Sequence, residues 1–563
     1  MKPSGVKVWA SIFAMLLCIQ SVSAHSLKGT VFDSSTNATL SGVIVYHKAT
    51  AKRVITGASG VFNLTIGGSA GVQSRAPSLA RDKKQLPEVP AGTVTLVFAR
   101  AGFEQQELAV SLGDTNLTIK LRPIYEKPGP SPALFAKPYY TCLRNFYVAT
   151  TGNDADDGSR AHPWRTIQHA NDMAPKAGDC INVLPGVYAS GATISHGGNQ
   201  ASSSGYVVYR STVLDGAVIT NPSAGFEIAA GENTVNYVII DGFELAASSE
   251  QVYGQGIKCW NGGSRRFQSH HIWVSNCIIH GYGQSGIQMN DGDYYYVIHN
   301  TLYNNCAATC DARGSGISFC VLKPATGYTP TADDAYNLTF GVLTPFHNVV
   351  NWNILHDNFI KKCGTVTNPY NTDGNGIIMD VFNNSGGTNL VYPYKTLIAF
   401  NVTYKNGNYG IHLFNSGMAS GNGFTVANNT SYNNNLDPAN RGTMRGEINN
   451  NGSVNATVIN NIAVSITGAG FLRDNNTYAC GGKAGDSYAN NIDGGQQHAR
   501  AWLPDVWSAS ANKAADPLWV DAAGGNFALK AGSPAIGYGQ TRDYLSLQSV
   551  TCGAYPYEEA KKR

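Results

Sequence analysis

The chain has 563 residues, of which 14% are charged and 43% apolar, and its formal net charge is only +3. Soluble domains usually carry about 25% charged residues, so this deficit indicates a surface of Asn, Ser, Thr, Gly and Tyr and argues against helical bundles. The length exceeds one ordinary domain, and the near-neutral charge argues against a nucleic-acid partner. After the first residues no apolar run approaches the ~20 residues that cross a bilayer. We therefore expect a soluble, β-rich protein with no membrane span.

Residues 1–24 are typical of a secretory signal peptide. Two lysines precede an apolar stretch at 8–19, and Val22-Ser23-Ala24 has the small-x-small spacing that signal peptidase accepts. We expect cleavage after Ala24 and a secreted protein, either extracellular or periplasmic. Ten cysteines would then remain in an oxidising compartment, which permits five disulfides but does not fix their pairing.

Residues 25–123 alternate apolar and polar positions in short runs separated by turn residues, which predicts a small β-sandwich. The succession KGTVFDSSTNATLSGVIVYH, TGASGVFNLTI and AGFEQQELAVSLGDTNLTIKL resembles the carboxypeptidase-regulatory-like domain. Members of that family are accessory modules without catalytic residues, so the resemblance implies a spacer or binding module. Residues 124–145 are Pro-rich and without a period, which predicts a semi-rigid linker.

Self-similarity is the main signal in residues 146–563. Blocks that begin with glycine start at positions 256, 286, 316, 376 and 410, and more weakly at 446 and 470. Between them, apolar strands end in asparagine, as at Asn276, Asn300, Asn358, Asn401, Asn429 and Asn461. Such a repeat is typical of a parallel β-helix, in which equivalent positions stack ~4.8 Å apart and asparagines continue the ladder at the bends. We interpret the 60-residue interval as one coil with an insertion at about 323–346.

Strand parity within the blocks predicts which side chains face the core. The isoleucine after each glycine and the residue two positions later should face inward: Ile257, Ile287, Ile317, Ile377, Ile411, and Cys259, Met289, Phe319, Met379, Leu413. Two rows should face outward: Lys258, Gln288, Ser318, Ile378, His412, and Trp260, Asn290, Cys320, Asp380, Phe414, Asn450. Cys306 and Cys363 each follow a histidine by seven residues in matching coils, so we expect them to stack and form a disulfide.

The entry segment NFYVATTGNDADDGSRAHPWRTIQHANDMAPKAGDCINVLPGVYASG resembles the opening of many secreted right-handed parallel β-helix proteins of the pectin-lyase-like group, including the family-9 polysaccharide lyases. The segment ADPLWVDAAGGNFALKAGSPAIGYG resembles their closing segment, so the resemblance covers about 146–557. It implies an all-β chain: a right-handed parallel β-helix preceded by a small β-sandwich. The group contains pectate, alginate and chondroitin lyases, polygalacturonases, epimerases and non-catalytic adhesins, so it does not select a substrate.

Candidate catalytic residues were sought on the outward rows. A lyase of this group must neutralise a uronate carboxylate and abstract a proton with a basic side chain, whereas a hydrolase needs two or three aspartates around the glycosidic oxygen. Asp380 lies on an outward row, Asp373 lies in the turn before the same strand, and His412 follows one coil later. We predict His412 as the base and Arg445 or Arg313 as the clamp for the substrate carboxylate.

Substrate contacts and a metal site are predicted beside these residues. Lys258 and Trp260 lie on the outward rows several coils before Asp380, and Tyr294 opens a tyrosine-rich strand whose rings could stack on sugars. Asp291 and Asp293 are two carboxylates two residues apart, which suits Ca²⁺. Calcium is therefore a candidate cofactor.

Three functions remain open at this stage. The leading one is a polysaccharide lyase that cleaves an acidic polysaccharide by β-elimination, and the second is a glycoside hydrolase that uses Asp373 with Asp380. The string NTDG around Asp373 resembles the first polygalacturonase motif, but the later motifs of that family are absent, as is the lysine motif of family-9 pectate lyases. The third is a non-catalytic polysaccharide-binding or wall-associated protein. We expect a monomer in each case.

Overall fold

The computed structural model describes residues 25–33, 39–40, 43–47, 53–57, 59–66, 93–99, 106–112, 116–121, 140–228, 234–250, 252–260, 268–308, 314–325, 336–337, 342–343, 346–360, 373–380, 392–414, 423–437, 446–466, 469–474, 485–494, 508, 510–541 and 551–554. The chain divides into two compact units, Met1–Ile124 and Tyr125–Arg563. The signal-peptide prediction falls on residues outside the described ones.

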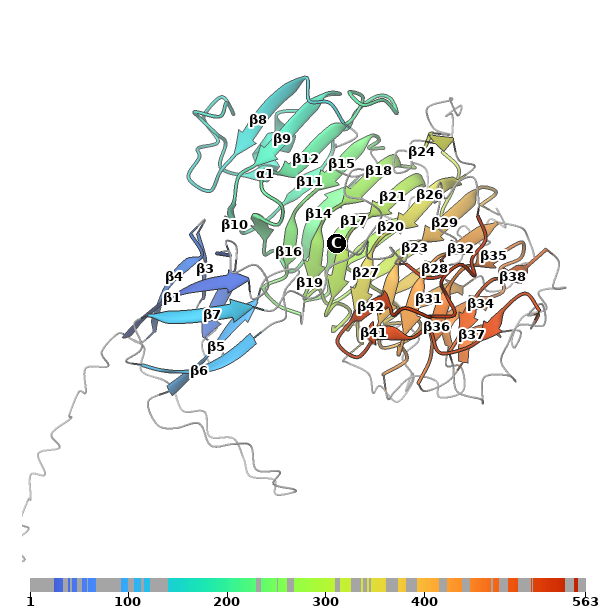
Figure 1. The fold of residues 1–563 in the computed structure, drawn as a ribbon. Helices are drawn as coiled ribbons and strands as arrows, with labels where there is room; N and C mark the ends of the chain where they lie inside the picture. The colour runs from blue at the N-terminus through green and yellow to red at the C-terminus, as the bar shows by residue number, and fades with distance from the viewer. Residues whose placement is uncertain are drawn as a thin grey trace, which may run out of the picture. The chain divides into compact units, whose positions relative to one another are not determined.

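The first unit is the predicted β-sandwich (Figure 1). One sheet has the order β4-β1-β7 and the other β3-β2-β5-β6. The strands are β1 His25–Asp33, β2 Ile44–His47, β3 Arg53–Ile55, β4 Val61–Ile66, β5 Thr93–Ala99, β6 Gln106–Ser111 and β7 Leu117–Leu121. In β4 the burial alternates strictly, because successive strand residues point to opposite faces, and its buried Phe62 packs edge-on against Phe98 of β5. This unit therefore has a hydrophobic core of its own.

The second unit is a right-handed parallel β-helix built from three long sheets (Figure 1). Sheet 1 contains β8 Arg144–Val148, β9 Asp179–Val183, β12 Val207–Ser211, β15 Val238–Asp241, β18 His270–Ser275, β21 Asp293–Ile298, β26 Phe346–Asn351, β29 Lys395–Ala399, β32 Phe424–Ala427, β35 Thr457–Ile459 and β38 Ser487–Ala489. Sheet 2 contains β10 Gly186–Tyr188, β13 Ala217–Ile219, β16 Glu244–Ala246, β19 Ile278–His280, β22 Thr301–Tyr303, β27 Ile354–His356, β30 Val402–Tyr404, β33 Thr430–Tyr432, β36 Ile462–Val464, β39 Ile492–Asp493 and β40 Lys513–Ala514. Sheet 3 contains β11 Ala192–Ile194, β14 Ala224–Ile228, β17 Gln255–Cys259, β20 Ile287–Asn290, β23 Ile317–Cys320, β28 Ile377–Asp380, β31 Ile411–Phe414, β34 Gly446–Asn451 and β37 Ala469–Asp474.

Three short elements complete the unit. The helix α1 Ile167–Asp172 lies near the entry and is capped by the Thr166 hydroxyl, which accepts a bond from the His169 amide. The two-stranded pairs are β24 Tyr336–Asn337 with β25 Val342–Leu343, and β41 Trp519–Asp521 with β42 Asn526–Leu529. Trp519 and Phe527 of the last pair belong to a hydrophobic cluster with residues of sheet 2, so the closing segment packs on that sheet.

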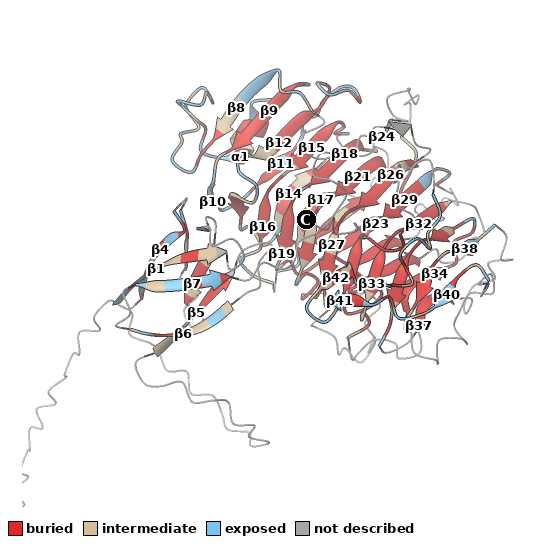
Figure 2. Cartoon of the chain, in the orientation of Figure 1, coloured by how far each residue is buried: buried red, intermediate tan, exposed pale blue. Residues whose placement is uncertain are grey.

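The predicted inward rows are confirmed. Ile257, Ile287, Ile317, Ile377 and Ile411 pair in succession along sheet 3, and all lie in the main core. Figure 2 shows the strands of the β-helix coloured largely as buried. Strand β23 pairs directly with β28, which confirms that the 60-residue interval is a single coil. One assignment was wrong: Asn450 pairs with the inward Leu413, whereas Asn449 pairs with the outward His412.

The repeated asparagines form two buried ladders. In the first, each side-chain amide donates to the side-chain oxygen of the next asparagine over 2.9–3.0 Å, from Asn300 to Asn512. Its members are Asn300, Asn353, Asn401, Asn429, Asn461, Asn491 and Asn512. Asn358 belongs instead to the second ladder, with Asn305, Asn406 and Asn434. Asn276 is in neither, since it bonds Asp241, and the ladder position before Asn300 is taken by Cys277.

The second ladder lies close to the glycines that open four of the blocks. A Cβ at Gly286, Gly316 or Gly376 would stand 3.1 Å from a ladder amide nitrogen, and at Gly410 it would stand 2.8 Å from that of Asn434. Other atoms lie closer still, such as the Gly376 carbonyl oxygen at 2.7 Å from a Cβ at Gly316, so the close stacking of backbone and interior side chains requires glycine at these positions. The next residue in this stack is Glu447, whose carboxylate accepts bonds from Asn434 and Ser431 and ends the ladder.

Among the described residues, a disulfide joins Cys142 to Cys180 and links the entry of the β-helix to β9. Cys259, Cys277, Cys320 and Cys552 are free thiols in the described part of the chain. The predicted partner of Cys306, Cys363, lies outside the described residues, so that disulfide stays a prediction.

Candidate active site

Asp373 and Asp380 lie at the two ends of the segment that contains β28. Asp373 is buried in the turn before the strand, where its Oδ2 accepts a bond from the Gly314 amide at 3.3 Å. Its Oδ1 accepts a second bond at 3.4 Å from the side chain of Asn375. Gly314 lies in the turn before β23 and Asn375 in the turn before β28, so the stacking of two successive coils positions this carboxyl.

Asp380 is the last residue of β28 and lies on the outward row, as predicted. The residue is half-buried, and its Cα partner on β23 is Cys320. The Cys320 thiol donates to Oδ2 over 3.7 Å, whereas Oδ1 is buried and has no hydrogen-bond partner among the described residues. Buried polar atoms are nearly always paired, so an unpaired carboxyl oxygen at a half-buried position marks a place for a ligand.

Burial raises the pKa of both carboxyls to about 7. For Asp373 the negative charge of Asp380 raises the pKa further, while the bonds from Gly314 and Asn375 lower it. For Asp380 the Cys320 thiol lowers the pKa. The negative charge of an ionised Asp380 opposes the ionisation of Asp373 and so favours the state in which Asp373 keeps its proton. Two such groups can accept one proton and donate another at the same pH.

His412 lies diagonally across from Asp380, one strand further and two residues earlier, which places their Cα atoms about 8 Å apart by strand geometry. Its imidazole is buried and both ring nitrogens lack a partner in the described structure. Burial lowers the pKa of His412 to about 3, so the ring is neutral at pH 7. Such a weakly basic ring is better suited to hydrogen bonding than to taking a proton.

Two further residues extend this surface and were not among the predicted site residues, although Phe414 was predicted to face outward. Asn449 is the Cα partner of His412, and both polar atoms of its buried side chain are without partners among the described residues. Phe414 is the half-buried Cα partner of Asp380, and its ring centroid lies 5.5 Å from that of His412. The signal for Asn449 was hidden because the block at 446 had been aligned on its glycine rather than on Ile448, which pairs with Ile411.

The predicted substrate contacts lie elsewhere on the β-helix. Lys258 is three strands from Ile378 in the same outward row, about 14 Å by strand spacing. It forms an ion pair of 2.8 Å with Glu227 and lies 5.0 Å from the ring of Trp260, which is 40% exposed. Tyr294 is buried on sheet 1, stacked between His271 and His347. The structure therefore does not bring Tyr294 together with Asp380 on one sheet.

The two carboxylates predicted to bind calcium are occupied by protein donors. Asp291 lies 3.3 Å from the ammonium of Lys323, and both side chains are buried. Asp293 contacts the ring of His347 at 3.1 Å and accepts a bond from the Tyr392 hydroxyl. In the described part of the chain no group of three or more histidine, cysteine or carboxylate side chains could hold a metal. This donor set does not fit Ca²⁺.

Arg313 and Arg445 lie outside the described residues. In sequence, Arg313 comes two residues before Ser315 and directly before Gly314, whose amide contacts Asp373. Arg445 directly precedes Gly446, the first residue of β34. Both therefore remain candidates for the carboxylate clamp.

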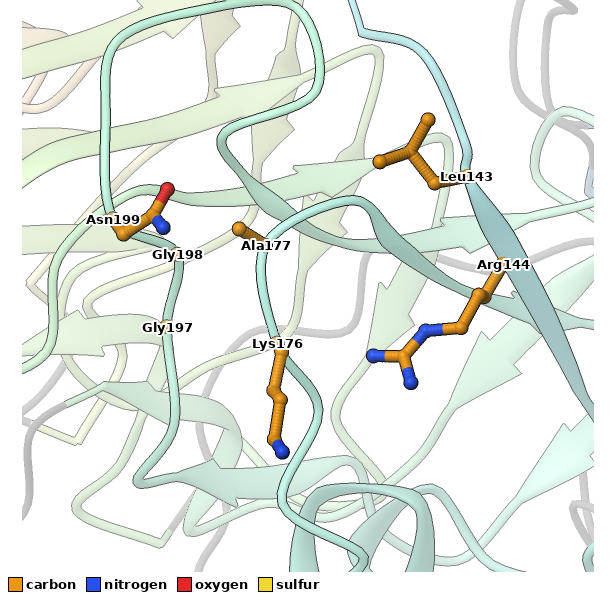
Figure 3. A pocket seen from close by; sticks show the side chains of 7 residues that line it. All are labelled: Leu143, Arg144, Lys176, Ala177, Gly197, Gly198 and Asn199. Carbon is orange, nitrogen blue, oxygen red and sulfur yellow. The ribbon is translucent and has the colours of Figure 1, made fainter.

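A separate hollow of about 550 Å³ lies near the entry of the β-helix (Figure 3). Leu143, Arg144, Lys176, Ala177, Gly197, Gly198 and Asn199 line it. Its arginine is held by Asp179 through two bonds of 2.6 and 2.7 Å. The hollow lies five coils from Asp380, about 24 Å by strand spacing, and holds no unpaired buried carboxyl or imidazole among its lining residues. The aspartate pair, not this hollow, is the stronger candidate for chemistry.

Comparison with known proteins gives no close relative. No family model matches the chain, and no curated protein matches it. Among solved structures it is similar to pectate lyase Pel9A, with 16% identity, a TM-score of 0.46, and coverage of 74% of this chain and 98% of that one. It is also similar to an alginate lyase from Paenibacillus sp. str. FPU-7, with 15% identity, a TM-score of 0.34, and coverage of 62% and 95%. A rhamnogalacturonan lyase gives 11% identity, a TM-score of 0.31, and coverage of 62% and 87%.

These likenesses are distant, so the assignment of the fold rests on the strand pairing itself. In the part of the chain that the structure describes, no helix has the length and apolar character that crossing a bilayer requires.

Proposed function

We propose that the chain is a secreted enzyme that cleaves an acidic polysaccharide by β-elimination on the outward face of sheet 3. The observation that carries this proposal is the pair Asp373 and Asp380, two carboxyls at the ends of the segment that contains β28, whose pKa values burial raises to about 7. A pKa near the working pH is what a general acid and a general base need. The unpaired Oδ1 of Asp380 is available to accept a hydrogen bond or a proton from the substrate.

In the proposed mechanism, ionised Asp380 takes the proton from C5 of a uronate unit. The electrons of that bond form the C4–C5 double bond as the bond from C4 to the glycosidic oxygen breaks. Protonated Asp373 gives its proton to the leaving oxygen, and a proton later passes back from Asp380 to Asp373. The polysaccharide is cleaved into two fragments, one of which ends in an unsaturated sugar and the other in the protonated leaving oxygen. No protons are consumed overall.

The uronate carboxylate must be neutralised before its C5 proton becomes acidic enough to remove. We assign this role to Arg313 or Arg445, because guanidinium binds carboxylate with two parallel bonds. Lys258 and Trp260 would bind a sugar further along the same face. His412, kept neutral by its burial, would donate or accept a hydrogen bond to the substrate instead of serving as the base.

Hydrolysis is the second candidate, because the same pair of carboxyls could act as acid and as base or nucleophile at a glycosidic bond. It is favoured by one observation: Lys258 and Lys323, two lysines of the described residues, are each already paired with a carboxylate. A polysaccharide-binding protein without catalysis is the outcome expected if neither reaction occurs.

The test is ultraviolet absorbance at the unsaturated-uronate band, with mature protein on pectate, alginate and glycosaminoglycans, with calcium and with chelator. A rise that is lost in Asp380→Asn and kept in Asp357→Asn, a half-buried aspartate in the turn after β27 of sheet 2, supports the lyase. New reducing ends without a rise support the hydrolase. No product from any polymer contradicts both, and calcium dependence would contradict the assignment of the arginines as sole neutralising groups.

The first unit is proposed to be an accessory domain of the carboxypeptidase-regulatory-like kind, which would hold the enzyme at its substrate or at a surface. Deletion of residues 25–123 should leave turnover of a soluble polymer within about twofold and weaken binding to an insoluble one.

A further inference from the structure

The outward face of sheet 3 has a second cluster of unpaired polar groups beside the aspartate pair. Four buried polar atoms, two on His412 and two on Asn449, have no hydrogen-bond partner among the described residues. The two residues are Cα partners on β31 and β34, so their side chains lie next to each other on the same face. Leaving one buried polar group unpaired costs about 1–3 kcal/mol, and here two complete side chains are unpaired.

An unpaired cluster of this size is understandable if a ligand supplies the missing partners. An imidazole and an amide together offer hydrogen-bond donors and acceptors but no charge, because burial keeps the His412 ring neutral. Sugar hydroxyls, which both donate and accept, match such a set. A carboxylate placed there would be desolvated without a cation to pair with, which is costly.

Phe414 adds an apolar surface to the cluster. Its ring is half-buried, lies 5.5 Å from the His412 ring and belongs to the Cα partner of Asp380. Aromatic rings present an apolar face on which the C–H face of a sugar can pack. A sugar that enters beside Phe414 and Asp380 would have its hydroxyls directed toward His412 and Asn449.

We propose that His412, Asn449 and Phe414 form a subsite for an uncharged sugar unit next to the bond that Asp380 cleaves. This inference rests on the proposed function and narrows its substrate class. The substrate is a polymer in which a uronate alternates with a neutral sugar, and a polymer of uronates alone fits the subsite poorly.

The experiment compares two matched pairs of polymers, each a polyuronate and a polymer that alternates the same uronate with a neutral sugar. One pair is galacturonate alone and galacturonate with rhamnose, and the other is glucuronate alone and glucuronate with N-acetylglucosamine. We expect kcat/KM on the alternating member of the cleaved pair to exceed that on the polyuronate at least tenfold. A preference for the polyuronate would overturn the inference while leaving the proposed function intact.

The variant Asn449→Asp keeps the shape of the side chain and introduces a carboxyl. It should raise KM for the alternating polymer at least tenfold with a smaller effect on kcat, and should change cleavage of the polyuronate much less. The matched control is Asn199→Asp, the same change at an exposed residue of the distant hollow. Because Asn449 is buried, a second variant covers the case in which Asn449→Asp lowers the melting temperature of the protein. In that case Phe414→Ala, a change at a half-buried residue that should also raise KM, provides the test.

Binding measurements test the sugar subsite separately from the proposed cleavage reaction. Hexasaccharides of the four polymers are titrated into the full chain carrying Asp380→Asn, and calorimetry reports affinity without turnover. Tighter binding of an alternating hexasaccharide, lost with Asn449→Asp, supports the subsite even if no polymer is cleaved and the proposed function fails. Equal affinity for both members of each pair, or no effect of Asn449→Asp, overturns it.

Discussion

Cys320 and Asp380 are paired on neighbouring strands, and the thiol donates to the Asp380 carboxyl across 3.7 Å. Burial raises the pKa of Asp380, and this bond opposes the increase because it stabilises the ionised form. The free thiol is itself held protonated, since burial and the charges of Asp380 and Asp291 raise its pKa. Cys320 therefore acts through Asp380 as a positioning residue and not as a nucleophile.

Replacement Cys320→Ala should raise the pKa of Asp380, because it removes the donor that favours the carboxylate. The acid limb of the pH–kcat/KM profile should then move to higher pH while the rate at the plateau changes little. Cys320→Ser, which retains a donor, should restore the wild-type limb. An unshifted limb in Cys320→Ala would show that the ionisation of Asp380 does not control that limb.

Asp380→Asn and Asp373→Asn should each reduce kcat by ~10² or more, because each removes a proton-transfer group. The double variant should be no worse than the more damaged single variant, since the pair acts as a unit. Single-turnover rates on the cleaved polymer provide the measurement. Wild-type kinetics in either single variant would show that the site has been placed wrongly.

The wild-type pH profile should be bell-shaped with both limbs near neutrality. Catalysis needs Asp380 ionised and Asp373 protonated, and burial brings the pKa values of both to about 7. Activity should fall at lower pH as Asp380 gains a proton and at higher pH as Asp373 loses one. A profile that is flat from pH 5 to 9, an interval of about two units on each side, would contradict proton transfer by this pair.

Glu447 predicts a pH dependence of stability that is independent of catalysis. It is buried at the end of the second asparagine ladder, and burial raises its pKa to about 7 from an ordinary 4.5. Because the folded pKa is the higher one, its contribution is fully present below pH 4.5 and is lost as the pH rises through 7. The free energy of unfolding lost in this way is on the order of 3 kcal/mol, at ~1.4 kcal/mol for each unit of pKa difference. Denaturant unfolding of Glu447→Gln between pH 5 and 8 should show a shallower decline than wild type, and an equal decline would contradict the assignment.

Asn353→Ala should destabilise the β-helix by about 3 kcal/mol or more, because it leaves several buried ladder groups without partners. The side-chain amide of Asn300 loses its acceptor, and the Asn401 side-chain oxygen and the Val297 carbonyl lose a donor. Exposed Asn199→Ala serves as the control and should change stability by less than about 0.5 kcal/mol. Similar denaturant midpoints for the two variants would show that the ladder does not carry this energy.

The sequence by itself predicted the β-helix, because the block of glycine and alternating apolar residues recurs from coil to coil. Ile257 and its equivalents had to face inward, since a stack of apolar residues every turn has no other place from which water is excluded. The same repetition placed Asp380 outward and Asp373 in the preceding turn. The alignment failed at the weak block, where Glu447 takes the place of the glycine and the true register is shifted by one residue. It also failed at Asn276 and Asn358, which do not belong to the first asparagine ladder.

Only the tertiary structure decided what those outward residues can do. Whether a carboxyl or an imidazole is charged depends on how much water and which groups surround it, and no residue pattern contains that information. Burial raises the pKa of Asp380 to about 7 and lowers that of His412 to about 3, and for this reason we propose Asp380 as the base in place of His412. The predicted calcium ligands Asp291 and Asp293 are paired with Lys323 and His347, which are distant in the chain, so only the tertiary structure shows these contacts. The unpaired side chain of Asn449 likewise becomes visible only when neighbouring coils are stacked.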